Sequence, residues 1–181
     1  RVDGNLHIQI SNAVELNLNA LIRVEGELLI MNSSASSSGS ELSTTSVTGV
    51  NMTSLTWIGG QLRTKGLNKL NTPLLRTTGG HLRVENFMEL NLFDFQSAAL
   101  VYLTCDPSAI ATGNGDFDAS ELCERLEESN IHHNVLDCDG NRCVSVGWSA
   151  QGIPEFEESL SGDISTNYTG FRRLTEKQFV N

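Results

Sequence analysis

A five-residue phrase that recurs between residues 4 and 102 constrains the fold more than any other feature of this chain. Each of four copies has a glycine, a variable residue, a leucine, a second variable residue and a β-branched residue. A looser fifth copy begins with alanine and ends with tyrosine. The copies begin 22, 34, 20 and 18 residues apart, at 4–8, 26–30, 60–64, 80–84 and 98–102. Recurrence at a period of about twenty residues is typical of a solenoid, in which each repeat forms one coil.

Apolar residues alternate within each copy, as Leu6, Ile8 and Ile10 do in the first. A period of two predicts a short strand with one buried face. Such a strand cannot bury that face alone, so we expect successive copies to pair in parallel and share one core. Further short apolar runs follow each copy and predict two or three strands per repeat. Together these patterns predict an all-β fold of the parallel β-helix type.

Two other fold classes compete with this interpretation. An antiparallel sandwich would join its strands by hairpin signals such as Asn-Gly, and none occurs between these strands. A leucine-rich repeat that carries helices fits less well, because no ten-residue amphipathic stretch separates the strands. The β-helix is therefore the favoured expectation.

The character of the sequence changes twice and predicts three segments. Residues 1–104 carry the repeats, with a Ser-rich insert at 32–48 that is either a glycosylated projection or a tolerated loop. Residues 105–148 contain every cysteine, and we expect a small disulfide-linked cap with one short helix at 116–128. Residues 149–181 have sparse apolar residues without a period, and we expect an extended tail that docks onto another surface, since its aromatic residues would otherwise be exposed.

Charge and cysteine content limit the compartment and the partners. A net charge of −10 argues against binding to nucleic acid or to an anionic membrane surface. No apolar stretch is long enough to predict a membrane span. The chain begins with arginine rather than methionine, which indicates a processed form or an excised piece.

The four cysteines predict two disulfides, with all three pairings open, and zinc binding is the alternative. Three Asn-x-Ser/Thr sites are candidates for glycosylation, so we expect a secreted or cell-surface protein. The cysteines are Cys105, Cys123, Cys138 and Cys143, and the glycosylation candidates are Asn32, Asn51 and Asn167.

A candidate calcium site lies at the start of the expected helix. Asn114, Asp116, Asp118 and Glu121 resemble the second half of an EF-hand loop, although the carboxylates that open such a loop are missing. The alternative is an ordinary Asp/Asn/Gly turn that caps the helix. Apart from this calcium candidate, we expect no cofactor.

Charged residues at outward positions of two neighbouring copies form a candidate binding face. Arg63 in one copy and His81, Arg83 and Glu85 in the next would lie side by side on paired strands. The alternative is an ordinary solvated face with paired charges. No nucleophile elbow, phosphate loop or paired-acid motif appears, so we predict that the chain is not an enzyme.

The repeated phrase, the leucine runs after it and the Trp-Ile-Gly-Gly corner at 57–60 resemble the receptor L-domain family. That family supplies the ligand-binding lobes of insulin and epidermal-growth-factor receptors. The resemblance covers about residues 4–103 and implies a right-handed β-helix of about five coils, capped at both ends, in an extracellular setting. It also implies a non-catalytic protein that binds other proteins, or builds surface structure, through a strand face. The insert in the second repeat and Thr64 at an inward position depart from the family pattern.

These observations predict a non-catalytic extracellular module that recognises a protein or a glycan. The alternative is a structural subunit of an extracellular or surface assembly, for which the aromatic-bearing tail is the supporting feature. A polysaccharide-processing enzyme is the least favoured interpretation.

Overall fold

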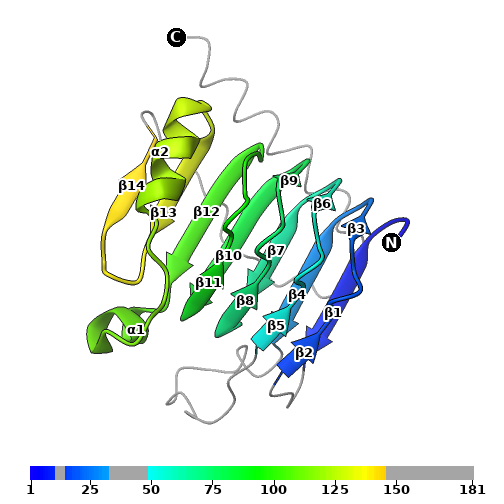
Figure 1. The fold of residues 1–181 in the computed structure, drawn as a ribbon. Helices are drawn as coiled ribbons and strands as arrows, with labels where there is room; N and C mark the ends of the chain where they lie inside the picture. The colour runs from blue at the N-terminus through cyan, green and yellow to red at the C-terminus, as the bar shows by residue number, and fades with distance from the viewer. Residues whose placement is uncertain (11–14, 33–48, 146–181) are drawn as a thin grey trace, which may run out of the picture. The chain divides into compact units, whose positions relative to one another are not determined.

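A computed structural model describes residues 1–10, 15–32 and 49–145 of the chain. The Ser-rich insert from residue 33 onward, and the expected docking tail at 149–181, lie outside the described residues. The described residues form short strands arranged in three sheets, with two helices in the later part of the described chain (Figure 1). No helix in the described ranges is long and apolar enough to cross a membrane.

The largest sheet has seven strands in the order β1-β4-β7-β10-β12-β13-β14. The five copies of the repeated phrase supply its first five strands, and each pairs in parallel with the next copy. The register aligns equivalent residues of successive copies, so that Leu28 pairs with Leu62 and Leu62 with Leu82. The strands are β1 (Leu6–Ile10), β4 (Leu28–Asn32), β7 (Leu62–Lys65), β10 (His81–Phe87), β12 (Leu100–Cys105), β13 (His132–Leu136) and β14 (Arg142–Val144).

Two smaller sheets complete each repeat. The four-stranded sheet has the order β11-β8-β5-β2, and the three-stranded sheet has the order β3-β6-β9. In the four-stranded sheet, asparagines at equivalent positions form a side-chain ladder, in which Asn71 donates to Asn51 and Asn51 donates to Asn17. The strands are β2 (Glu15–Asn17), β5 (Gly49–Asn51), β8 (Lys69–Asn71), β11 (Glu89–Asn91), β3 (Arg23–Val24), β6 (Trp57–Ile58) and β9 (Thr77–Thr78).

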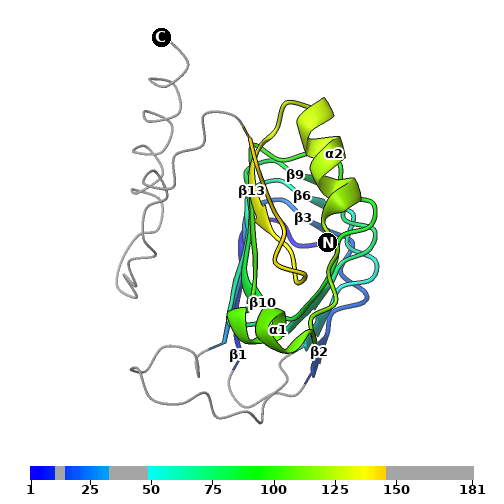
Figure 2. The same ribbon diagram turned by 90° about the vertical axis from the view of Figure 1, so that its left-hand side faces the viewer.

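The core lies between the three sheets and is built from the inward residues of every repeat (Figure 2). Leu28, Leu62, Leu82 and Val101 occupy one inward row of the seven-stranded sheet and are fully buried. His133 continues this row on β13. Its Nδ1 lies 2.8 Å from the carbonyl oxygen of Ile131, whereas its buried Nε2 has no hydrogen-bond partner among the described residues.

The predicted fold class, a right-handed parallel β-helix of about five coils with a one-helix cap, is wrong. The described residues form three sheets of seven, four and three strands, the largest of which mixes parallel and antiparallel pairing, and two helices. The repeated phrase ends at residue 102, yet β13 extends the sheet beyond the last copy. The chain then reverses, because the Asp137 carboxylate accepts bonds from the backbone N–H groups of Asp139 and Asn141, and β14 returns antiparallel to β13.

The two helices lie at the β14 end of the sheets, where Figure 2 shows them facing the viewer. The first, α1 (Pro107–Thr112), begins after Asp106, whose carboxylate accepts a 2.8 Å bond from the Ser108 N–H, and ends at Gly113 in the left-handed conformation. The second, α2 (Ser120–Glu128), buries Leu122 and Leu126 against the core. A six-residue helix leaves almost no periodic pattern, which is why the sequence did not indicate α1.

Candidate functional site

Equivalent turns follow the strands of the four-stranded sheet at 18–22, 52–56, 72–76 and 92–96, and we call their outer surface the turn face. The first three turns lead into the three-stranded sheet, and the fourth leads to Ser97, which forms a bridge with Thr77 of β9. A backbone bond across three residues closes each turn, as from Leu55 N to Met52 O at 3.1 Å. The residue that donates the N–H of this bond points inward in every repeat. Leu21, Leu55, Leu75 and Phe95 are the four inward residues, and all are buried. The first position is also buried in three of the turns, at Met52, Thr72 and Leu92, so the remaining positions lie at the surface.

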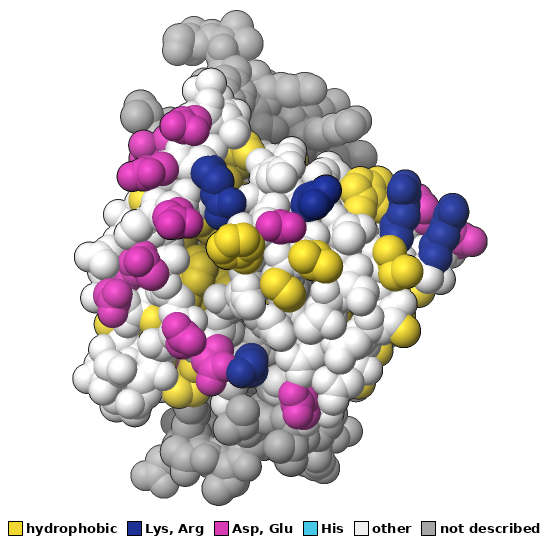
Figure 3. Space-filling view, viewed as in Figure 1, with side chains coloured by type: hydrophobic (Ala, Val, Ile, Leu, Met, Phe, Trp, Pro, Cys, Tyr) yellow, Lys and Arg dark blue, Asp and Glu magenta, His cyan; other side chains and the backbone are white. Residues whose placement is uncertain are grey.

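Large apolar side chains occupy several of these outward positions. Phe93 is 74% exposed, Ile22 56% and Leu74 43%. In the space-filling view of this side, hydrophobic side chains form a broken band across the middle of the surface, between basic and acidic groups (Figure 3). A hydrogen bond from α2 holds the backbone of the Phe93 turn, because Nη1 of Arg125 donates a 3.0 Å bond to the Phe93 carbonyl oxygen. The exposed ring is therefore carried by a braced backbone.

Arginines flank the apolar side chains of the turn face. The Arg23 guanidinium lies 3.8 Å from the centre of the Trp57 ring and also pairs with Glu25. Arg76 and Asp94, from neighbouring turns, lie 3.8 Å apart. Tryptophan, phenylalanine and arginine are the residue types that most often anchor protein interfaces. The turn face thus combines exposed apolar area with directional hydrogen-bond donors.

Sequence reasoning missed the turn face, although a signal for it exists. The register of the paired asparagines aligns Phe93 with Asn19, Thr53 and Pro73 of the earlier turns. A phenylalanine at a position that is otherwise polar or a turn former interrupts the pattern, and only a repeat-by-repeat alignment reveals it.

The structure brings the predicted binding-face residues together on the outward side of β7 and β10. Arg63 and Arg83 are register partners, and Arg83 forms an ion pair with Glu85 and lies 5.3 Å from the centre of the Tyr102 ring. The Arg83 and Glu85 side chains are only 16% and 18% exposed. Burial, and then the charges of Arg63 and Arg83, hold the pKa of His81 below its ordinary value of 6.5. Binding at this face stays a prediction.

The calcium candidates do not converge on one point. The Asp118 carboxylate accepts bonds from the N–H (2.8 Å) and Oγ (2.7 Å) of Ser120 at the start of α2, and these bonds lower its pKa. Asp116 lies beside β11, where its N–H donates to the Met88 carbonyl. Within the described ranges no three His, Cys, Asp or Glu side chains gather as a metal site would require. The Asn114 N–H donates to the Ala109 carbonyl at the end of α1, and Glu121 lies in the first turn of α2. A calcium site stays a prediction.

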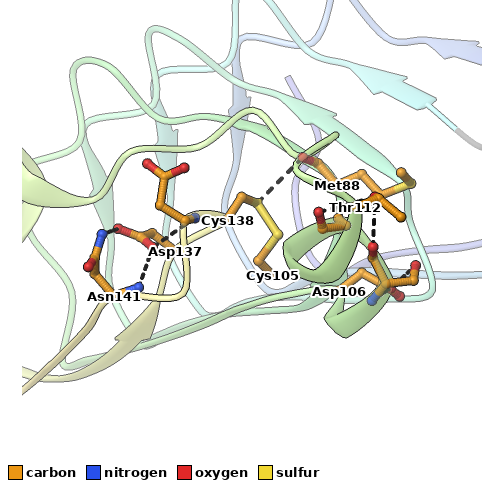
Figure 4. The surroundings of a disulfide bond; sticks show 10 residues. Met88, Cys105, Asp106, Thr112, Asp137, Cys138 and Asn141 are labelled. Atoms are coloured by element: carbon orange, nitrogen blue, oxygen red, sulfur yellow. Dashed lines mark hydrogen bonds between the residues drawn. A yellow bond between two sulfur atoms is a disulfide. The ribbon is translucent and has the colours of Figure 1, made fainter.

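The four cysteines form two disulfides, Cys105–Cys138 and Cys123–Cys143, so the zinc alternative is excluded. The first links the end of β12 to the turn after β13, and its Cys138 sulfur lies 3.5 Å from the Met88 carbonyl oxygen (Figure 4). The second links α2 to β14. The disulfides therefore hold together the end of the sheet that the repeats do not supply.

Two of the candidate glycosylation sites lie within the described residues. The Asn51 amide nitrogen donates to Asn17 at 3.0 Å and to Glu15, so this side chain is engaged in the asparagine ladder. The Asn32 amide nitrogen donates to the carbonyl oxygen of Gly66 at 3.2 Å. Asn167 lies outside the described residues. Glycosylation at all three positions stays a prediction.

The resemblance to the receptor L-domain family remains a hypothesis that is based on the repeated phrase and the 57–60 corner. Comparisons with family models, with curated proteins and with solved structures found no match for this chain.

Proposed function

We propose that this chain is a non-catalytic extracellular module that recognises a protein partner through its turn face. The observation that carries the proposal is the exposure of Phe93, Ile22 and Leu74 on one set of equivalent turns. Large apolar side chains that gather on one exposed face are costly in water, and such patches commonly mark an interaction site. The braced Phe93 turn also lowers the entropy lost on binding, because its backbone is already ordered.

The chemistry of the face specifies the partner. Phe93 and Leu74 require apolar pockets, and each would bury most of its side chain only in a protein surface of matching shape. Arg76 has a 62% exposed side chain and Arg23 a 46% exposed one, so both can donate bonds to carboxylate or carbonyl acceptors at the rim of those pockets. We infer a folded protein partner with apolar pockets and an acceptor-rich rim.

The proposed compartment depends on the cysteines. The chain contains two intrachain disulfides, and disulfide bonds persist mainly in oxidising compartments. We therefore propose that the partner is encountered in the secretory pathway, at the cell surface or outside the cell.

A quantitative capture experiment tests the proposal. The disulfide-intact chain is immobilised and exposed to the extracellular and membrane-surface proteins of its source, and bound proteins are quantified by mass spectrometry. Wild type is compared with Phe93→Ser and Leu74→Ser. Val144→Ser is the matched control, because Val144 is also an exposed apolar residue, 39% exposed, on the terminal strand β14 away from the turns.

A true partner is retained equally by wild type and Val144→Ser and falls at least about tenfold with Phe93→Ser, as expected for an interface anchor. The purified partner should reproduce this difference in a direct binding measurement. If no protein discriminates between Phe93→Ser and Val144→Ser, the turn face is not the recognition surface.

A further inference from the structure

The strand β1 is the outermost strand of the seven-stranded sheet, and among the described residues only β4 pairs with it. The Leu6 N–H donates to the Glu27 carbonyl at 2.8 Å, which fixes the direction of the backbone groups on this strand. Backbone groups alternate sides along a parallel strand. The N–H and C=O groups of His7 and Gln9 therefore point away from β4, toward the open edge.

Among the described residues, this edge lacks several of the features that usually prevent strand pairing. Residues Leu6–Ile10 read Leu-His-Ile-Gln-Ile, with neither a proline nor an aspartate, glutamate, lysine or arginine. Edge strands of monomeric proteins are commonly short, charged, bulged or covered. The opposite edge follows that rule, since β14 has three residues, begins with Arg142 and is tied to α2 through Cys143.

The core is also less well covered at the β1 end than elsewhere. Leu6 and Ile8 are only partly buried, whereas their register partners Leu28 and Ile30 are fully buried. Leu16 on β2 is likewise partly buried, and its partner on β5 is fully buried. The backbone groups of His7 and Gln9 that point to the edge, and the partly buried side chains of Leu6 and Ile8, thus coincide on one surface.

We propose that two copies of this chain associate edge to edge through β1, antiparallel about a two-fold axis at Ile8. In this register Ile8 faces its own symmetry mate, and Leu6 of each copy lies opposite Ile10 of the other. Every inward apolar residue therefore meets another inward apolar residue. On the outward side His7 lies opposite Gln9, so no like charges oppose each other.

The backbone geometry agrees with this register. In an antiparallel pair, residues whose N–H and C=O groups face the partner strand exchange both hydrogen bonds. His7 and Gln9 are the residues that point to the open edge, and the two-fold axis places them opposite each other. A two-fold interface needs only one self-complementary surface, and β1 meets that requirement. This association goes beyond the proposed function and does not rest on it.

Light scattering on a sizing column, with the full disulfide-intact chain over a concentration series, tests the proposal. We expect a concentration-dependent rise to twice the chain mass. Gln9→Pro removes a donor that points to the open edge and leaves the bonds to β4 in place. One donor is lost from each copy, and a net hydrogen bond contributes about fivefold to an equilibrium constant, so the dimer should weaken about twenty-five-fold. Gln9→Thr keeps the N–H and should still dimerise.

Two further measurements separate lost association from lost folding. Circular dichroism of Gln9→Pro should match that of monomeric wild type. Under mild oxidation Ile8→Cys should form a covalent dimer through position 8, and Val144→Cys on the opposite edge should not. A wild type that stays monomeric at every concentration, a dimer that Gln9→Pro leaves intact, or the absence of an Ile8→Cys cross-link would each overturn the proposal.

Discussion

Replacing Gly79 with alanine tests how tightly successive repeats are packed. A Cβ atom at this position would lie 2.0 Å from the carbonyl oxygen of Gly59 in the previous repeat. Contacts of a Cβ atom below 3.0 Å essentially do not occur, so the two backbones must separate by at least 1 Å. The Cβ atom is fixed to the backbone of residue 79 and meets a backbone oxygen, so no side-chain rotation can relieve the contact.

The separation has a cost that follows from the local hydrogen bonds. Gly79 N donates to Ile58 O at 2.8 Å, and Gly80 N donates to Gly60 O at 2.7 Å. A displacement of that size takes both beyond hydrogen-bond distance. Two lost bonds cost about 2 kcal/mol, and the strain of overpacking adds about 1–3 kcal/mol. We therefore expect Gly79→Ala to lower the free energy of unfolding by about 3–5 kcal/mol.

The neighbouring glycine provides a matched control. A Cβ atom at Gly80 would approach its nearest backbone atoms at 3.2 Å, which a shift of a few tenths of an ångström relieves. We expect Gly80→Ala to cost less than about 1 kcal/mol. Urea unfolding followed by circular dichroism, with the disulfides intact, measures both variants. A loss below about 1 kcal/mol for Gly79→Ala, or equal losses for both variants, would refute this account of the packing.

Three other predictions concern the disulfides and two histidines. Changing Cys105 and Cys138 together to serine should lower the free energy of unfolding by about 3–4 kcal/mol in urea, because the bond closes a loop with a sequence separation of 33; an unchanged midpoint would contradict this. His133→Leu should leave the urea midpoint unchanged or raise it, since it removes a buried nitrogen that has no partner among the described residues, while His133→Ala should lower it by about 2–4 kcal/mol. The pKa of His81 is lower in the folded chain than its ordinary value of 6.5, so the unfolded chain binds more protons and stability should fall as the pH drops below 6.5. His81→Gln should weaken that dependence in thermal melts at several pH values, and an identical pH profile would exclude His81 as its source.

The parts of the fold that repeat could be predicted, and the parts that occur once could not. The phrase at 26–30 returns at 60–64 with the same alternation, so the parallel neighbours in the large sheet follow from the spacing alone. The predicted fold class is wrong, since the described residues form three sheets with mixed pairing, and β13 joins the largest sheet although no copy of the phrase marks it. The reversal that follows depends on the bonds of one carboxylate, that of Asp137, and no periodic signal encodes them.

The two candidate surfaces show why residue type alone is a poor guide to a site. Arg83 and Glu85 were singled out for their charge, yet the structure pairs them with each other and leaves little of either exposed. Phe93 was not singled out from the sequence, where it is one apolar residue among several, yet the inward position of its turn belongs to Phe95 and Phe93 faces solvent. What decides function here is therefore the position of each residue within the repeat. An aromatic residue at an outward turn position has no role in packing its own repeat, so a binding partner becomes the stronger explanation for it.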